Sequence, residues 1–326
     1  MAFKRKFYDY EYWPFWLFYA PFLPYWIWNS IRSGSFSYFC KVNPGLEFGG
    51  FLDYSKYKIL QQIPDEFKPK TNFIRTKNDI LKILPKGKLE GAFPFVVKPD
   101  FGERGKNVEV IRSIEDWDKY PLEQNLIIQE FVELPFEFGI FYANLPENKH
   151  RILSITGKEF LIYRADGNST LKEFVENHPR AVSRTAYLKN KFHNLWESIL
   201  PKNTEILLEP IGNHNRGTRF FDASHLISDE LETRINEIAD EIQGFNYGRF
   251  DVKTQSEEDV KTGKFIILEI NGANSEPTHI YDSEFTLMQA YKEVKRHLDV
   301  QFEISGSQPK THSDFEFFKA ALKRMF

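Results

Sequence analysis

The sequence predicts a mixed α+β fold with antiparallel strand pairs, on three observations. Short apolar runs bounded by glycine, proline and acidic residues are typical of strands, and the clearest lie at residues 95–98 and 265–271. Two later segments carry apolar residues at helical spacing instead. Strands follow strands without regular intervening helices, so repeated parallel βαβ units are not expected.

The elements are expected in the following order. Asp53, Tyr54 and Ser55 begin a helix that carries Lys56, Tyr57, Ile59 and Leu60. A polar, proline-rich stretch with one helical piece near residues 79–84 follows. The expected strands lie at residues 95–98, 108–111, 126–128, 138–142, 152–156, 159–163, 249–253 and 265–271. The expected later helices lie at residues 188–199, 227–242, 284–300 and the C-terminus.

Length, charge and cysteine content limit the number of domains and the kinds of ligand to be expected. At roughly 150 residues per domain, 326 residues suggest about two domains. Forty-three basic and 46 acidic residues give a net charge of −3, which leaves no basic excess for binding nucleic acid. One cysteine excludes an internal disulfide framework and a multi-cysteine zinc site, and it fits a reducing cytoplasm.

The N-terminal segment is unusually aromatic. Between Phe7 and Trp28, 13 of 22 residues are aromatic, and four of the six tryptophans lie here. Neither a cleaved leader nor a membrane-spanning helix is expected. Acidic residues separate the basic residues at the N-terminus from the apolar run, and Pro14, Pro21 and Pro24 interrupt that run. Two alternatives remain open: an arm packed on the protein's own surface, or a segment lying in a membrane interface.

The last two strands carry the clearest chemical pattern. Arg249 and Asp251 share one strand face, and so do Glu269 and Asn271, because side chains alternate along a strand. If residues 254–264 connect a hairpin, the four side chains converge, and their oxygen atoms suit Mg²⁺. The alternative is an ordinary surface hairpin with outward polar residues.

Lys98 ends the first clear strand, and a glycine-containing loop at residues 100–107 follows it. A lysine in this place can neutralise a phosphate group while the loop closes over it. The GxxxxGK[ST] and GxGxxG patterns are both absent. The alternative interpretation is a strand-end lysine beside a tight turn.

Taken in order, these segments resemble a known family. FVVKPDFGERGKNVEVI, LIIQEFVELPFEFGIFY, GRFDV and ILEINGANSEP are similar to motifs of the ATP-grasp superfamily, above all to D-alanine–D-alanine ligases and related carboxylate–amine ligases. IYRADGNSTLKEFVENHPRA also resembles a GDGxxTxxEL stretch of such ligases, without its first glycine. The resemblance implies an ATP-grasp domain over residues 52–305, with a nucleotide-binding subdomain near 90–165 and a metal-binding, catalytic subdomain near 166–305. An arm at residues 1–51 and a linker with a helix at 306–326 flank it.

The same resemblance implies ATP and Mg²⁺ as cofactors and assigns residues to them. Two lysines would contact phosphate, a glycine loop would close over it, and a hinge and a glutamate would hold adenine and ribose. These residues are Lys56, Lys98, Gly102, Arg104, Gly105, Gln129, Glu130, Val132 and Glu137. Asp251, Glu269 and Asn271 would bind the metal, and Arg249, with Lys98, would act in catalysis. The implied reaction forms an acyl phosphate, which an amine or a thiol then attacks.

Further residues are candidates for substrate binding. The loop that holds His214, Arg216 and Arg219 can bind an anionic group, although loops are normally polar and exposed. Glu276 and His279 follow the metal strand, and His279 is either a general base or a structural histidine at a helix start.

Three functional hypotheses follow. The first is a ligase that joins a small-molecule carboxylate to an amine. The second is a small-molecule kinase, since the same phosphate and metal residues serve phosphoryl transfer. The third is a non-catalytic, membrane-associated protein that binds ATP.

The C-terminus supports a membrane contact. Phe315, Phe318 and Leu322 share a helical face near Lys319, Lys323 and Arg324. Together with the aromatic arm, this favours a cytoplasmic protein that is peripheral on the membrane, with both segments packed on the protein's own body as the alternative. The oligomeric state is not predicted.

Overall fold

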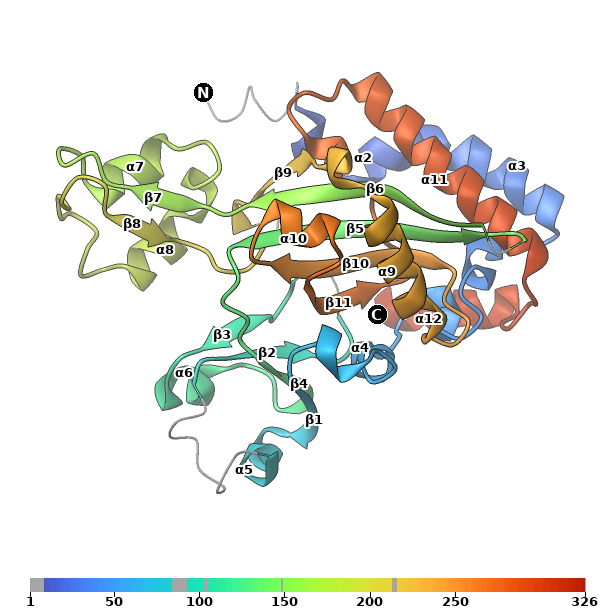
Figure 1. Cartoon of the computed structure of the whole chain (residues 1–326), viewed down its shortest axis with the longest axis horizontal. Helices are drawn as coiled ribbons and strands as arrows, with labels where there is room; N and C mark the ends of the chain where they lie inside the picture. The colour runs from blue at the N-terminus through green and yellow to red at the C-terminus, as the bar shows by residue number, and fades with distance from the viewer. Residues whose placement is uncertain (1–8, 84–92, 103–104, 148, 213–215, 326) are drawn as a thin grey trace. The chain divides into compact units, whose positions relative to one another are not determined.

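The computed structural model describes residues 9–83, 93–102, 105–147, 149–212 and 216–325. The chain divides into two compact units (Figure 1). Unit 1 holds residues 1–73, 132–157 and 221–326, and unit 2 holds residues 74–131 and 158–220. Each unit therefore draws on segments that are far apart in the sequence.

Unit 1 is built on a five-stranded sheet with the order β11-β10-β5-β6-β9. Its strands are β5 (Phe136–Leu145), β6 (Lys149–Glu159), β9 (Arg219–Asp222), β10 (Tyr247–Thr254) and β11 (Ile266–Asn271). Strand β10 pairs antiparallel with both β5 and β11. The predicted α+β class with antiparallel strands is confirmed.

Helices cover both faces of this sheet because its strands alternate apolar side chains to either side. Helix α9 (Asp229–Asp240) packs its buried Leu231 and Ile235 on the face that carries Ile140 and Phe250. Helix α11 (Leu287–Ser307) packs on the other face, beside Phe141. The short helices α4 (Lys56–Leu60) and α10 (Glu257–Lys261) also belong to unit 1.

The aromatic N-terminal segment forms helices α2 (Phe15–Tyr19) and α3 (Leu23–Ser33), joined by η2 (Ala20–Phe22). Its prolines lie at helix starts, where no intrahelical N–H donor is needed: Pro14 precedes α2 and Pro24 is at the start of α3. Phe18 is buried with Ile280, Ala290 and Val294 in a small core beside α11. Within the described residues, no helix is both long and apolar enough to cross a membrane.

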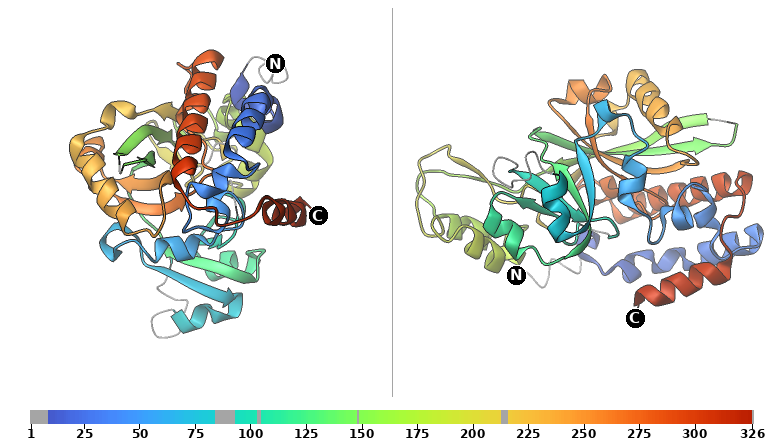
Figure 2. Two further views of the ribbon diagram at one scale, coloured as in Figure 1. Left: turned by 90° about the vertical axis from the view of Figure 1, so that its right-hand side faces the viewer. Right: turned by 90° about the horizontal axis from the view of Figure 1, so that it is seen from below.

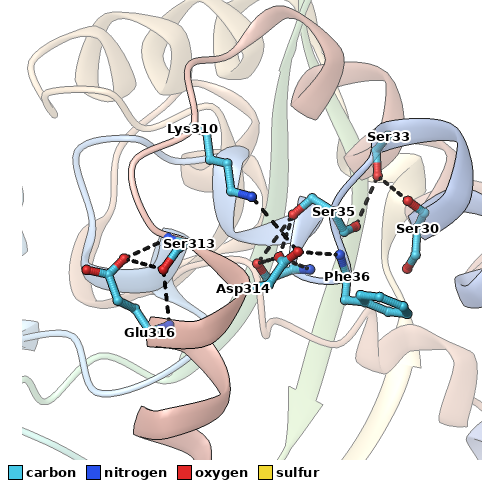
Figure 3. A network of polar contacts seen from close by, with 9 residues as sticks. Ser30, Ser33, Ser35, Phe36, Lys310, Ser313, Asp314 and Glu316 are labelled. Atoms are coloured by element: carbon cyan, nitrogen blue, oxygen red, sulfur yellow. Dashed lines mark hydrogen bonds and ion pairs between the residues drawn. The ribbon is translucent and has the colours of Figure 1, made fainter.

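The C-terminal helix α12 (Asp314–Met325) is joined to the turn after α3 (Figure 3). The Asp314 carboxylate accepts hydrogen bonds from the hydroxyl groups of Ser35 and Ser37 at 2.6 and 2.5 Å, and from the N–H groups of Phe36 and Ser37. Partial burial raises the pKa of Asp314, but these hydrogen bonds outweigh it and hold the pKa well below its usual range.

Unit 2 contains two separate small sheets. One has the order β1-β4-β2-β3 and the other pairs β7 with β8. Their strands are β1 (Thr71–Thr76), β2 (Phe95–Pro99), β3 (Glu109–Ile111), β4 (Gln124–Glu130), β7 (Ile162–Arg164) and β8 (Glu205–Leu207). The helices beside them are α5 (Ile80–Ile83), α6 (Ile114–Lys119), α7 (Leu171–Asn177) and α8 (Thr185–Lys191).

Short 3₁₀ helices fill several connections. They are η1 (Tyr10–Tyr12), η3 (Tyr38–Lys41), η4 (Glu47–Gly50), η5 (Asp65–Phe67), η6 (Lys77–Asp79), η8 (Val182–Arg184), η10 (Ser224–Leu226) and η11 (Thr278–Tyr281).

Several sequence expectations need correction. The helix predicted over residues 188–199 ends at Lys191. The chain continues in turns whose N–H groups donate to carbonyl groups three residues earlier, and apolar residues three or four positions apart suit such turns as well as a helix. Strands β1, β8 and β9 were not predicted, since none of them contains more than two consecutive apolar residues. Helix α11 runs to Ser307, beyond the expected end, because Val300 and Ile304 continue its buried face.

Candidate functional site

The strand pair β10–β11 brings the predicted metal residues together. In its register, Arg249 lies opposite Asn271 and Asp251 lies opposite Glu269. Opposite residues of an antiparallel pair project from the same face of the sheet. The predicted convergence of the four side chains is therefore confirmed, and it places two carboxylates side by side.

Asp251 is the centre of this group and is 8% exposed. Arg249 donates to both of its oxygens, from Nε to Oδ1 and from Nη2 to Oδ2, each at 3.0 Å. Asn271 donates from Nδ2 to Oδ2 at 2.8 Å. Burial alone would lower the pKa of Arg249, but the carboxylates of Asp251, Glu269 and Glu276 raise it.

Glu269 forms an ion pair with a separate cation, Lys56. Lys56 Nζ lies 2.7 Å from Glu269 Oε1, and the lysine is 6% exposed. Ser55 places Lys56 by accepting from the N–H of Lys58 and so starting helix α4, which lies against β11. Lys56 thus lies among the predicted metal ligands in this structure.

Gly139 on β5 is a site residue that sequence reasoning missed. It lies directly opposite Asp251 in the β5–β10 register. A Cβ atom there would lie 2.9 Å from Arg249 Cδ and 3.3 Å from Asp251 Oδ1. The glycine leaves room for the Arg249–Asp251 pair, and a lone glycine inside an apolar strand was the available indication.

Glu276 is held by two tyrosines, one of them from the N-terminal segment. Its Oε1 accepts from Tyr19 at 2.5 Å and from Tyr281 at 2.9 Å, and its backbone carbonyl accepts from Arg249 Nη1 at 3.0 Å. Burial and the Glu276 charge raise the pKa of Tyr19 well above its ordinary value, so its hydroxyl stays a donor. Helix α2 therefore reaches the surroundings of Arg249, which the sequence did not indicate.

His279 lies in a different, largely buried group. It is 3% exposed, and its Nε2 is 3.5 Å from Glu293 Oε1, which His297 approaches at the same distance. Tyr247 shares a hydrogen bond of 2.9 Å with His297 Nδ1. Burial lowers the pKa of His297 to about 4. A general-base role for His279 stays a prediction.

The oxygen atoms of Asp251, Glu269 and Asn271 fit Mg²⁺ in chemistry. One or two carboxylates with substrate phosphates are its usual set, and a carboxamide oxygen is an equally hard donor. In this structure Arg249 and Lys56 balance both carboxylate charges. No cluster of three or more histidine, cysteine or acidic residues suited to a metal occurs in the part of the chain that is described.

In unit 2, Lys98 and Gln129 lie together on neighbouring strands. Lys98 is 3% exposed, and its Nζ donates to Gln129 Oε1 at 3.2 Å. Gly102 and Gly105 follow in the loop, where Gly105 has a φ of 65°, a conformation that favours glycine. Arg104 lies outside the described residues.

The residues of the predicted adenine hinge are divided between unit 2 and unit 1. Gln129 and Glu130 end strand β4 in unit 2, whereas Val132 and Glu137 belong to unit 1. The Val132 carbonyl accepts a hydrogen bond from Lys253 Nζ at 3.1 Å, and Lys253 lies opposite Glu137 in the β5–β10 register.

The arginines of the predicted anion-binding loop face different partners. Arg216 lies 3.4 Å from Glu209 Oε1 and donates to the carbonyls of Gly105 and Val108 at 3.3 and 2.9 Å. Arg219 pairs with the exposed Glu159 instead. His214 lies outside the described residues. Arg216 thus holds the end of the glycine loop, and an anion-binding role for the loop stays a prediction.

Comparison with known proteins gives structural likenesses to ligases and synthetases. No protein-family model matches the sequence, and no curated protein matches it. The similar structures include a bifunctional glutathione synthetase from Pasteurella multocida, at 13% identity over 74% of this chain and 35% of that one, with a TM-score of 0.40. A D-alanine–D-alanine ligase from Bacillus anthracis has 14% identity, 76% and 64% coverage, and a TM-score of 0.39.

A third likeness is to the N5-carboxyaminoimidazole ribonucleotide synthetase of Thermotoga maritima, at 13% identity, 79% and 51% coverage and a TM-score of 0.36. The chain spans less than two thirds of each of these three proteins. Similarity this low does not extend to what the chain acts on.

Proposed function

We propose that the chain is an ATP- and Mg²⁺-dependent ligase that joins a small-molecule carboxylate to an amine. The observation that carries the proposal is the β10–β11 register, which sets Asp251 directly beside Glu269. Like charges directly opposite each other destabilise a sheet. A pair of this kind, with an arginine and an amide beside it, suits the binding of a cation and the stabilisation of an oxyanion.

In this proposal the metal is held by Asp251, Glu269 and Asn271. When bound, Mg²⁺ supplies positive charge against the phosphate oxygens. For the metal to bind, Lys56 would release Glu269, and the freed ammonium group would turn to a phosphate. Arg249, fixed by both oxygens of Asp251, would stabilise the oxyanion of the tetrahedral intermediate.

The proposed nucleotide site uses the residues that the motifs assign. Lys98 would contact a phosphate, the loop from Gly102 to Gly105 would close over it, and Arg216 would anchor the loop's end through the Gly105 carbonyl. The hinge from Gln129 to Val132 and the carboxylate of Glu137 would bind adenine and ribose.

The proposed reaction has two steps. A carboxylate oxygen of the substrate attacks the γ-phosphorus of ATP, the bond from that phosphorus to the bridging oxygen breaks, and ADP leaves. The amine nitrogen then attacks the carbonyl carbon of the acyl phosphate, phosphate leaves, and the nitrogen loses a proton. No covalent intermediate with the protein is needed.

Two other functions use the same residues. A small-molecule kinase would stop after the transfer of the phosphoryl group, and a non-catalytic protein would only bind ATP. The presence of Arg249, Asp251, Glu269 and Asn271 together favours a catalytic protein, because a protein without catalysis would be expected to have lost one of them.

The proposal also includes a location, the cytoplasmic face of a membrane. Support comes from the exposed apolar side chains of the N-terminal helices, among them Trp16 and Trp28. An amphipathic substrate would fit this location.

The test is ADP release measured against crossed panels of carboxylic acids and amines, with mass spectrometry of the products. A ligase releases ADP only when both substrates are present and forms a product with a new amide bond. Glu269→Gln is the inactive control, and Glu237→Gln, an exposed glutamate of α9, is the matched neutral change. ADP release with one substrate and a phosphorylated product would favour the kinase.

A further inference from the structure

Helices α2 and α3 present large apolar side chains to the outside of unit 1. The most exposed are Phe15, Trp16, Leu23, Ile27, Trp28 and Ile31, which we call the apolar face. Trp16 is 70% exposed and Ile31 is 68% exposed. Leu23, Ile27 and Ile31 recur at intervals of four residues, so they form one ridge along α3.

The opposite side of the same helices is firmly attached to unit 1. Phe18 is 2% exposed and stacks on Tyr10, and Tyr19 donates to Glu276. Ser35 and Ser37, just after α3, bind the Asp314 carboxylate (Figure 3). The apolar face is therefore held in place by the fold and is not a loose arm that could bury itself elsewhere.

Its charge distribution suits an anionic surface. Residues 14–33 contain no acidic residue, and their one charged residue is Arg32, although the whole chain is net negative. In both views of Figure 2, α3 and α12 lie on the same side of unit 1. Exposed Lys319 and Lys323 follow Phe318 and Leu322 on α12.

Aromatic contacts connect α3 to α12. Phe36, which follows α3, contacts the ring of Phe318 on α12 with centroids 6.5 Å apart, and Trp26 contacts Phe36 at 5.9 Å. Phe315 is 76% exposed on the same part of α12. Exposed aromatic and basic side chains thus occur together on α12, which contacts the segment after α3.

We propose that the apolar face inserts into the interfacial layer of an anionic membrane, with α3 and α12 lying along its surface. The inference rests on the membrane location proposed above and not on the ligase activity. Tryptophan prefers the boundary between headgroups and hydrocarbon, and lysine and arginine at the rim attract anionic headgroups. Exposed tryptophans in a segment without acidic residues suit a membrane interface better than a protein partner.

The test measures co-sedimentation of the full-length protein with vesicles, without ATP or substrates. Vesicles of phosphatidylcholine alone are compared with vesicles of three parts phosphatidylcholine to one part phosphatidylserine. We expect binding to the anionic vesicles, a blue shift of tryptophan fluorescence, and partial weakening by added salt. The double variant Trp16→Glu/Trp28→Glu should lower the apparent affinity by about tenfold or more.

The control is Ile199→Glu/Leu207→Glu, which adds the same charge at exposed apolar residues of unit 2. It should bind as the unchanged protein does. Both variants should keep their unfolding temperature, since all four side chains lie at the surface and none belongs to a buried core.

Three results would overturn the inference: no binding to anionic vesicles at low salt, unchanged binding of the Trp16/Trp28 variant, or equal loss in the control. A dimer that the Trp16/Trp28 variant makes monomeric, without vesicle binding, would assign the face to self-association. Because no turnover is measured, failure here leaves the ligase proposal intact, and an inactive protein that binds vesicles leaves this inference intact.

Discussion

Asp251 in unit 1 and Glu209 in unit 2 are both nearly buried carboxylates held by arginine, yet their surroundings differ. Glu209, 2% exposed, gives one oxygen to Arg184 at 3.2 Å and the other to Arg216 at 3.4 Å. Arg216 also donates from Nη2 to two backbone carbonyls. The contacts of Glu209 therefore connect segments of one unit.

Asp251 is also paired with an arginine, but a second carboxylate, Glu269, is set beside it. Such a pair costs stability, and a structural ion pair has no need of it. A buried arginine–carboxylate pair is therefore not by itself evidence of a site. What indicates a site is a second carboxylate set beside the first, whose negative charge has to be balanced, here by Lys56.

The largest loss of activity is expected from changes to the paired carboxylates. Asp251→Asn and Glu269→Gln should each lower ADP release by about three powers of ten, since a positioned metal supplies several kcal/mol. The measurement is ADP release with the substrate pair found in the screen. Turnover within about tenfold of the unchanged protein, beside a normal Glu237→Gln control, would contradict the assignment. Asparagine is preferred to alanine at position 251 because it keeps a partner for the buried Arg249.

The second prediction concerns Glu209. Glu209→Gln should lower the free energy of unfolding by about 3 kcal/mol, because two partly buried arginines lose their common carboxylate. Urea unfolding measures the change. The exposed pair Arg164–Glu205 gives the control, where Glu205→Gln should cost less than about 1 kcal/mol. Equal effects of the two changes would show that Glu209 is not a structural centre.

The third prediction concerns Lys98, a buried lysine that lies beside a neutral side chain. Lys98→Ala should weaken ATP binding by about tenfold to a hundredfold, the range of a lost charged hydrogen bond. Lys98→Arg should also weaken it, since a planar guanidinium does not replace a compact ammonium in a closed space. Calorimetric titration with ATP measures both. Unchanged affinity in Lys98→Ala would make this lysine a purely structural strand end.

The smallest effect is expected at Asp314, a carboxylate held by hydroxyl and N–H groups instead of arginine. Its pKa lies below the ordinary value in the folded protein, so its stabilisation is present above about pH 4 and declines as the pH falls toward the folded pKa. Asp314→Asn should cost about 1 kcal/mol at pH 7, and the difference should shrink below pH 4. Urea unfolding at both pH values tests this, and a pH-independent difference would refute the mechanism.

The group on β10 and β11 could be predicted from the sequence, on the condition that the two strands pair as a hairpin. The period of two along a strand places Arg249 with Asp251 and Glu269 with Asn271, and a short connection leaves antiparallel pairing as the simple arrangement. The strand expected at residues 95–98 was equally readable from its apolar run, although β2 extends one residue further, to Pro99. These are local patterns, which need no knowledge of distant segments.

Only the tertiary structure decided which distant residues complete these groups. Tyr19 reaches Glu276 across 257 positions, Arg216 reaches Val108 across 108, and Gly139 meets Arg249 from a neighbouring strand. The aromatic segment itself was ambiguous in the sequence, since burial and exposure both favour aromatic residues. Its division into a packed side around Phe18 and an exposed side around Trp16 depends on which helix face meets α11, and packing of the whole unit determines that.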